Sequence, residues 1–146
     1  MDFSIREMTI DDYDQAYRLW VQTEGLSLGE SDCKEGISLY LRRNPGLCFV
    51  ATVGKDIAGT ILCGHEGRRG ILRHLVVKSN FRRKGIARSL VNECLCALGR
   101  DGIKKCNTFV DDTNAEGRRF WEHLGWHVLE DNYRTMQSVT TQGKGF

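Results

Sequence analysis

A short basic loop with one glycine lies between a predicted strand and a predicted helix. The loop reads Arg82-Arg83-Lys84-Gly85-Ile86-Ala87, and Arg88 follows it. The first N–H groups of a helix have no partner within that helix, so they carry partial positive charge and favour an anion such as a phosphate. Glycine lets the backbone approach this anion closely, and the basic side chains add whole charges around it. The loop therefore predicts a phosphate-binding site.

The two elements that must position this loop are indicated by the apolar pattern. Residues 71–77, Ile-Leu-Arg-His-Leu-Val-Val, are long enough and apolar enough for one buried strand. Apolar residues then recur at steps of three and four, as in an amphipathic helix that runs to residue 98: Ile86, Leu90, Val91, Cys94, Leu95 and Leu98. The sequence contains neither Gly-x-Gly-x-x-Gly after a strand nor Gly-x-x-x-x-Gly-Lys-Ser/Thr, so two common nucleotide motifs are excluded.

The rest of the chain alternates between β-rich runs and helical patterns. Further strands are predicted at residues 3–5, 47–53, 57–63 and 103–110, with a last hairpin formed by 126–129 and 133–139. Further helices are predicted at 13–20, 31–41 and 117–124, with Ser31 capping the second and Gly125 ending the last in a left-handed conformation. This order implies an α/β (α+β) fold with a mixed, mostly antiparallel sheet of six or seven strands and about four helices. Residues 140–146 are predicted to be loose.

The basic loop resembles the acyl-CoA signature of the GNAT N-acetyltransferases, Gln/Arg-x-x-Gly-x-Gly/Ala. Residues 114–126, Asn-x-x-Gly-x-x-Phe-Trp-x-x-x-Gly-Trp, are similar to that family's Asn-x-x-Ala-x-x-Phe/Leu-Tyr-x-x-x-Gly-Phe. The resemblance extends along essentially the whole chain, so it implies one GNAT-like domain over residues 1–146 and an acetyl-CoA-dependent N-acetyltransferase without a metal. The chain departs from the family at Ser79, which is commonly proline there, and at Trp121, which is often tyrosine.

The resemblance also implies how acetyl-CoA would bind as the cosubstrate. Its pyrophosphate would lie over the backbone from Arg83 to Arg88, and its pantetheine arm would pair with residues 75–77 as an added strand does. The residues expected to bind it are Leu75, Val76, Val77, Arg82, Arg83, Lys84, Gly85, Ile86, Ala87, Arg88, Asn114 and Trp121.

Four residues are predicted to serve the chemistry. The family places the acetyl carbonyl near the N–H group at the end of the strand, here Val77, which would stabilise the oxyanion of the tetrahedral intermediate. An attacking alkylammonium, with a pKa of about 10.4, must first lose a proton to a base. Glu66 and His74 rank first for this role by predicted location, ahead of Glu24, Glu30 and His65. The resemblance implies that the residue at position 121, often a tyrosine in the family, protonates the departing CoA thiolate. The indole of Trp121 cannot do so, and the proton would then come from water or from another residue, for which we select Tyr133.

The composition argues against nucleic-acid, membrane and metal partners. The chain has 146 residues with 21 basic and 19 acidic side chains, and its net charge of +2 does not require a nucleic acid. Basic residues gather between Arg68 and Arg88, but the lack of interleaved aromatic residues other than Phe81 argues against a nucleic-acid surface. The six cysteines form no Cys-x-x-Cys pair and no Cys/His ligand spacing, and no signal or membrane-spanning pattern is found. We therefore expect a reduced, cytoplasmic protein without a membrane or metal partner.

Three points stay open from the sequence alone: the acceptor, the catalytic function and the oligomeric state. The acceptor is a small-molecule or peptide amine, and acidic residues that could attract its cation are scattered: Glu24, Glu30, Asp32, Glu66, Asp111 and Asp112. Because Trp121 replaces the usual tyrosine, the alternative function is a catalytically weak acyl-CoA-binding module that senses the cofactor or regulates a partner. The sequence does not indicate the oligomeric state, and only analogy with the family allows a homodimer.

Overall fold

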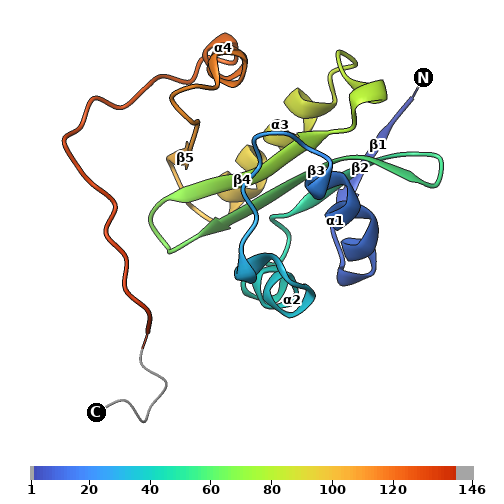
Figure 1. The fold of residues 1–146 in the computed structure, drawn as a ribbon, viewed down its shortest axis with the longest axis horizontal. Helices are drawn as coiled ribbons and strands as arrows, with labels where there is room; N and C mark the ends of the chain where they lie inside the picture. Colours follow the sequence, from blue (N-terminus) through green and yellow to red (C-terminus); the bar gives the residue numbers. More distant parts are fainter. Residues whose placement is uncertain (1, 141–146) are drawn as a thin grey trace. The chain divides into compact units, whose positions relative to one another are not determined.

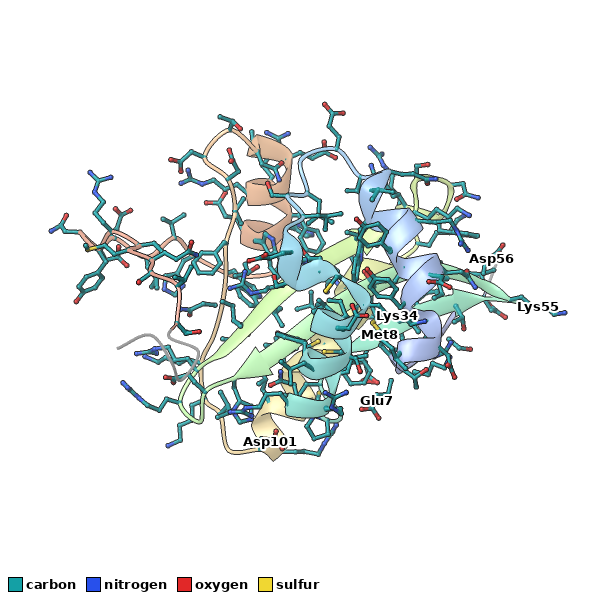
Figure 2. All side chains as sticks on the ribbon, turned by 60° about the horizontal axis from the view of Figure 1, so that its bottom comes forward. Glu7, Met8, Lys34, Lys55, Asp56 and Asp101 are labelled. Atoms are coloured by element: carbon teal, nitrogen blue, oxygen red, sulfur yellow. The ribbon has the colours of Figure 1, made fainter. Side chains whose placement is uncertain are left out.

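One five-stranded sheet forms the centre of the first of two units. The computed structural model describes residues 2–140, and the chain divides into the units Met1–Asp111 and Asp112–Phe146 (Figure 1). The strands, in their order across the sheet, are β1 Ser4–Glu7, β2 Phe49–Val53, β3 Asp56–His65, β4 Gly70–Val77 and β5 Cys106–Thr108. Strands β1 to β4 pair antiparallel, and β5 pairs in parallel with the start of β4. The strands predicted at residues 47–53, 57–63 and 71–77 are confirmed as β2, β3 and β4, which form an antiparallel meander, and Figure 2 shows Lys55 and Asp56 at the tip of its first hairpin.

Three α-helices cover the two faces of this sheet. They are α1 Tyr13–Val21, α2 Lys34–Arg43 and α3 Ile86–Arg100, joined by short 3-10 turns η1 Ile10–Asp12, η2 Glu30–Asp32 and η3 Ser79–Phe81. Helices α1 and α2 lie on one face and α3 lies on the other (Figure 1). The second unit contains α4, Ala115–His123, so the described residues contain the four α-helices that the pattern predicted. None of these helices is long and apolar enough to cross a membrane.

Helix α3 is anchored beside the end of β4. Two glycines of the sheet allow its close approach, because a Cβ on Gly70 would clash with Leu98 and a Cβ on Gly59 would lie 3.2 Å from Ile86. Gly59 pairs with Val77, the last residue of β4, and Ile86 is the first residue of α3. Packing therefore holds the first turn of the helix next to the end of the strand, on either side of the basic loop.

The predicted last hairpin, residues 126–129 with 133–139, does not form. Residues 126–140 contain no strand, so the sheet has five strands within residues 2–140 and not the six or seven expected. The apolar side chains of Tyr133, Met136 and Val139 are exposed. A two-stranded hairpin that buries no apolar face does not offset the entropy lost on ordering its backbone. Residues 141–146 of the predicted loose end lie outside the described residues.

Strand β5 is shorter than the predicted run of residues 103–110. The start of that run closes α3 instead of joining the sheet. Gly102 has a left-handed φ of +82°, and the N–H of Ile103 donates to the carbonyl of Leu98 at 2.9 Å. This pattern is a Schellman closure, which satisfies carbonyls that the helix end leaves without partners.

The cap of α2 also differs from the prediction. Ser31 lies within η2, and Cys33 is the residue before the helix, where its Sγ accepts a hydrogen bond from the N–H of Gly36 at 3.4 Å. The turn η2 occupies residues 30–32 because the carboxylate of Asp32 accepts from the N–H of Gly29 at 2.8 Å. The helix therefore begins two residues later than a cap at Ser31 would allow.

Candidate active site

His74 lies at a bulge in β4. Thr60 of β3 pairs with Val76 and Leu62 pairs with Arg73, so two residues of β4 face one residue of β3. His74 itself has a φ of +51°, in the left-handed region that non-glycine residues seldom occupy. Such a conformation costs roughly 1–3 kcal/mol and persists only where the surroundings hold it.

A buried chain of hydrogen bonds stabilises the left-handed backbone of His74. The indole Nε1 of Trp20 donates to Thr60 Oγ1 at 2.9 Å, and this hydroxyl donates to the carbonyl of His74 at 2.9 Å. Both Trp20 and Thr60 are fully buried. The imidazole of His74 also lies edge-on to the indole, with ring centroids 4.7 Å apart. The core between α1 and the sheet thus positions both the backbone and the ring of His74.

Asp32 is paired with His74 across 42 residues of sequence. The His74 Nε2 lies 2.7 Å from Asp32 Oδ1, and each side chain is 11% exposed. The hydroxyl of Tyr13 donates to the backbone carbonyl of Asp32 at 2.7 Å. Burial, with the nearby hydroxyl of Tyr17, raises the pKa of Tyr13 and keeps this hydroxyl a donor. The sequence placed His74 on the strand but contained no spacing rule that relates it to Asp32, Trp20 or Thr60.

The end of β4 has a backbone edge that β5 does not cover. The N–H of Lys78 donates to the carbonyl of Ala58 at 2.8 Å, so in the antiparallel alternation the N–H and carbonyl of Val77 point away from β3. Strand β5 pairs with β4 only at residues 70–72. The Nε of Arg82 donates to the Val77 carbonyl at 3.2 Å. The structure therefore brings together the strand end and the basic loop, both predicted as site elements.

The basic loop leads into the N-terminus of α3 through two left-handed residues. Arg83 has a φ of +64°, and Gly85, the residue before the helix, has a φ of +84°. A Cβ on Gly85 would meet nothing within 4 Å, so its backbone conformation and not a lack of space favours glycine there. The first turn of α3 has no side-chain cap and no acidic residue, whereas Ile86 is buried. The N–H groups of this turn are therefore left to an external acceptor such as a phosphate.

Glu66 and Tyr133, the other two predicted catalytic side chains, are both exposed. Glu66 is exposed in the turn between β3 and β4, before the strand begins. Tyr133 is exposed in the segment after α4, where its N–H lies 3.4 Å from Asp131 Oδ1. Among the residues that the structure describes, no group of three or more His, Cys, Asp or Glu side chains is arranged to hold a metal ion.

The predicted cofactor residues of the second unit have local structural partners. The Oδ1 of Asn114 accepts from the N–H of Gly117 at 2.9 Å and so caps α4. The ring of Trp121 lies 4.6 Å from that of Trp126, whose N–H donates to the Trp121 carbonyl at 3.0 Å. Gly125 has a φ of +94°, which confirms the predicted left-handed end of this helix.

Comparison with known proteins identifies the family. Residues 6–126 match the acetyltransferase (GNAT) family. The chain is 29% identical over 140 residues to an acetyltransferase of Sodalis glossinidius, an alignment that covers 96% of this chain and 93% of that relative. It is 33% identical over 105 residues to N-alpha-acetyltransferase 30 of Xenopus laevis, with coverage of 65% of this chain and 38% of that protein.

A solved structure has the same fold. The PaiA N-acetyltransferase of Thermoplasma acidophilum, determined in complex with coenzyme A, superposes with a TM-score of 0.77 at 21% identity, covering 90% of this chain and 94% of that one. The family match includes β4, the basic loop, α3 and α4. The chain therefore belongs to the GNAT family and is an acetyltransferase.

Proposed function

We propose that this acetyltransferase moves the acetyl group of acetyl-CoA to a primary amine by direct attack of the amine on the thioester. The uncapped N-terminus of α3 behind Gly85 is the observation that carries the proposal, because its N–H groups and the exposed side chains of Arg82, Arg83 and Lys84 suit a pyrophosphate. The complex of the PaiA relative with coenzyme A supports the same cofactor.

The cofactor would lie along the open edge of β4. The pyrophosphate would bind the backbone from Arg83 to Arg88, and the pantetheine amides would pair with residues 75–77, where β5 leaves the strand uncovered. Asn114 and Trp121 complete the proposed cofactor site by resemblance to the family, with the chain acting as a single domain over residues 1–146.

The N–H of Val77 would stabilise the oxyanion of the tetrahedral intermediate, since it points out of the sheet at this edge. We select His74 over Glu66 as the base. Glu66 precedes β4, whose two ends lie about 20 Å apart at the rise of a β-strand, whereas His74 is only three residues from Val77. A base at His74 would therefore lie near the carbonyl that the Val77 N–H binds.

The CoA sulfur leaves as a thiolate or a thiol. A thiol with a pKa of about 8.5 is a tolerable leaving group, so an acid lowers the barrier without being indispensable. Trp121 cannot supply the proton, and we propose that water or Tyr133 does so. The acceptor is an amine on a small molecule or a peptide, and the N-alpha-acetyltransferase relative favours including peptides with a free α-amine in the search.

The test is calorimetric titration of acetyl-CoA into the wild type, Gly85→Asp and Gly54→Asp. Both glycines have left-handed φ angles and open space at the Cβ, but Gly54 lies in the turn between β2 and β3. We expect micromolar binding by the wild type and by Gly54→Asp, and none by Gly85→Asp, because its carboxylate would face the pyrophosphate. No binding by the wild type would contradict the proposal. Binding without release of CoA thiol across a panel of alkylamines and peptides would favour the sensor alternative.

A further inference from the structure

We propose that Asp32 is a positioning residue, which holds the imidazole of His74 in the tautomer whose Nδ1 takes the proton of the acceptor amine. The inference rests on the proposed function for its chemistry. The tautomer of His74 is inferred from the contacts between Asp32 and His74 alone, and a separate experiment tests it.

The contacts of Asp32 define which nitrogen carries the proton. An ionised carboxylate only accepts hydrogen bonds, and Asp32 Oδ2 already accepts from the N–H of Gly29 at 2.8 Å. Its Oδ1 lies 2.7 Å from His74 Nε2. This nitrogen must therefore donate, so in the neutral imidazole the proton is on Nε2 and the lone pair is on Nδ1.

The Nδ1 atom is reachable. It has no hydrogen-bond partner within the part of the chain that the structure describes. Over the same residues, the hydroxyl of Tyr40 is the only fully buried polar side-chain atom that lacks a hydrogen-bond partner. Because Nδ1 also lacks a partner, it is not fully buried. The His74 side chain is 11% exposed, so Nδ1 keeps a limited solvent access through which an amine or a bridging water can contact it.

The ring of His74 has two fixed contacts, the edge-on indole of Trp20 and the carboxylate of Asp32. The hydroxyl of Thr60 holds the backbone carbonyl of the same residue. Asp32 is in turn held by the hydroxyl of Tyr13 on α1, which donates to its backbone carbonyl, and by the N–H of Gly29, which donates to its carboxylate. The arrangement resembles a base and its orienting carboxylate, in which the carboxylate stabilises the imidazolium that forms.

The step balances as follows. The alkylammonium gives one proton to His74 Nδ1, and its freed electron pair forms the C–N bond at the acetyl carbonyl. The oxyanion then collapses, the C–S bond breaks and the sulfur leaves with its electron pair. The second proton leaves the nitrogen for the thiolate through water, and the imidazolium returns its proton to solvent while Asp32 stays ionised.

Nitrogen NMR of the histidine side chains tests the tautomer without an acceptor. The four histidines allow the His74 signals to be assigned with His74→Gln. At pH 8 we expect the proton of His74 on Nε2 in the wild type, and a mixture of tautomers in Asp32→Asn. The matched control is Asp101→Asn, since Asp101 lies 3.1 Å from Nε2 of another histidine, His65. The control should leave the His74 signals unchanged, and a proton on Nδ1 in the wild type would overturn the inference.

Kinetics with an alkylamine that the panel identifies tests the role. We expect His74→Gln and Asp32→Asn to lower kcat/KM at least tenfold at pH 7, with unchanged affinity for acetyl-CoA. This loss of kcat/KM should become smaller toward pH 10, because more of an amine with a pKa of about 10.4 is then already neutral and needs no base. A merely structural defect would lower the rate equally at both pH values. If the wild type transfers acetyl groups and both variants keep its kcat/KM, the inference fails while the proposed function stands. If the wild type transfers no acetyl group to any amine, the proposed function fails. The NMR experiment then still tests whether Asp32 holds the tautomer of His74.

Discussion

Gly36 of α2 lies directly against the backbone carbonyl of Ser31. A Cβ on Gly36 would clash with the carbonyl oxygen and lie 2.8 Å from the carbonyl carbon. The φ angle of Gly36 is not positive, so close packing and not conformational freedom requires glycine there. Because Ser31 precedes Asp32 in η2, this contact determines how closely η2 approaches the start of α2, and with it where the partner of His74 lies.

Gly36→Ala should therefore lower both stability and activity. We expect a loss of about 1–3 kcal/mol in the free energy of unfolding, since a backbone carbonyl must move, and a fall in kcat as Asp32 shifts from His74. The matched control is Gly99→Ala in α3, where a Cβ meets nothing within 4 Å. It should gain about 0.5–1 kcal/mol from helix propensity. Urea unfolding measures both, and equal stability of the two variants would contradict the packing argument.

The pair between Arg6 and Asp12 should make stability depend on pH. Burial alone would raise the pKa of Asp12, but hydrogen bonds from Arg6 at 2.7 and 2.8 Å and from the N–H of Thr9 at 2.9 Å outweigh it and lower that pKa. A lowered pKa in the folded state adds stability above the unfolded value of about 3.9, and this stability is lost as the pH falls through the folded value.

Asp12→Asn should consequently be less stable than the wild type at pH 7 by about 1–3 kcal/mol, because Arg6 loses its charged partner. The difference should narrow at pH 3 and below. The exposed neighbour Asp11 offers the control, since Asp11→Asn should change stability by about 0.5 kcal/mol or less. Urea unfolding at the two pH values measures this, and a difference that is constant with pH would refute the role of the charge.

Trp121→Tyr should keep or increase kcat, because a phenol can protonate the departing sulfur where an indole cannot. Trp121→Phe is the control: it removes the indole without adding a hydroxyl and should bring no gain. Steady-state thiol release measures both variants, alongside titration with acetyl-CoA. Loss of turnover in Trp121→Tyr with cofactor binding intact would argue against placing this side chain beside the sulfur.

Only two of the six cysteines should react quickly with a thiol reagent in the folded protein. Cys33 and Cys96 are exposed, whereas the other four are wholly or partly buried. Burial raises the pKa of Cys48 to about 12 and that of Cys106 to about 12, which keeps both thiols protonated and unreactive. All six should react in denaturant.

The variant with Cys33→Ser and Cys96→Ser should lose the fast phase of labelling and keep its fold, since serine is a good cap for α2. Fast labelling of a third cysteine would show that the core opens. The same variant removes the background from assays that detect released CoA thiol.

The elements around the basic loop could be predicted because their signals are local. The strand at residues 71–77 and the helix that follows are determined by the spacing of apolar side chains along a few turns, and Gly85 and Gly125 are marked by the left-handed conformations that glycine favours. The prediction of the last hairpin was wrong because its signal was local while its formation depends on distant parts of the chain. Alternation at residues 133–139 permits a strand, but a strand forms only where a partner edge and a buried face exist.

The sequence by itself determined the order of the elements as far as the last helix, the basic composition of the loop and the family to which the chain belongs, since these depend on residues close together along the chain. Only the tertiary structure decided that Asp32 meets His74, that Trp20 and Thr60 hold the bulge, and that the N–H of Val77 faces an uncovered edge. Residues 42 positions apart meet because α1, η2 and the sheet pack around one core. No local pattern encodes that meeting, because it depends on which buried faces fit one another.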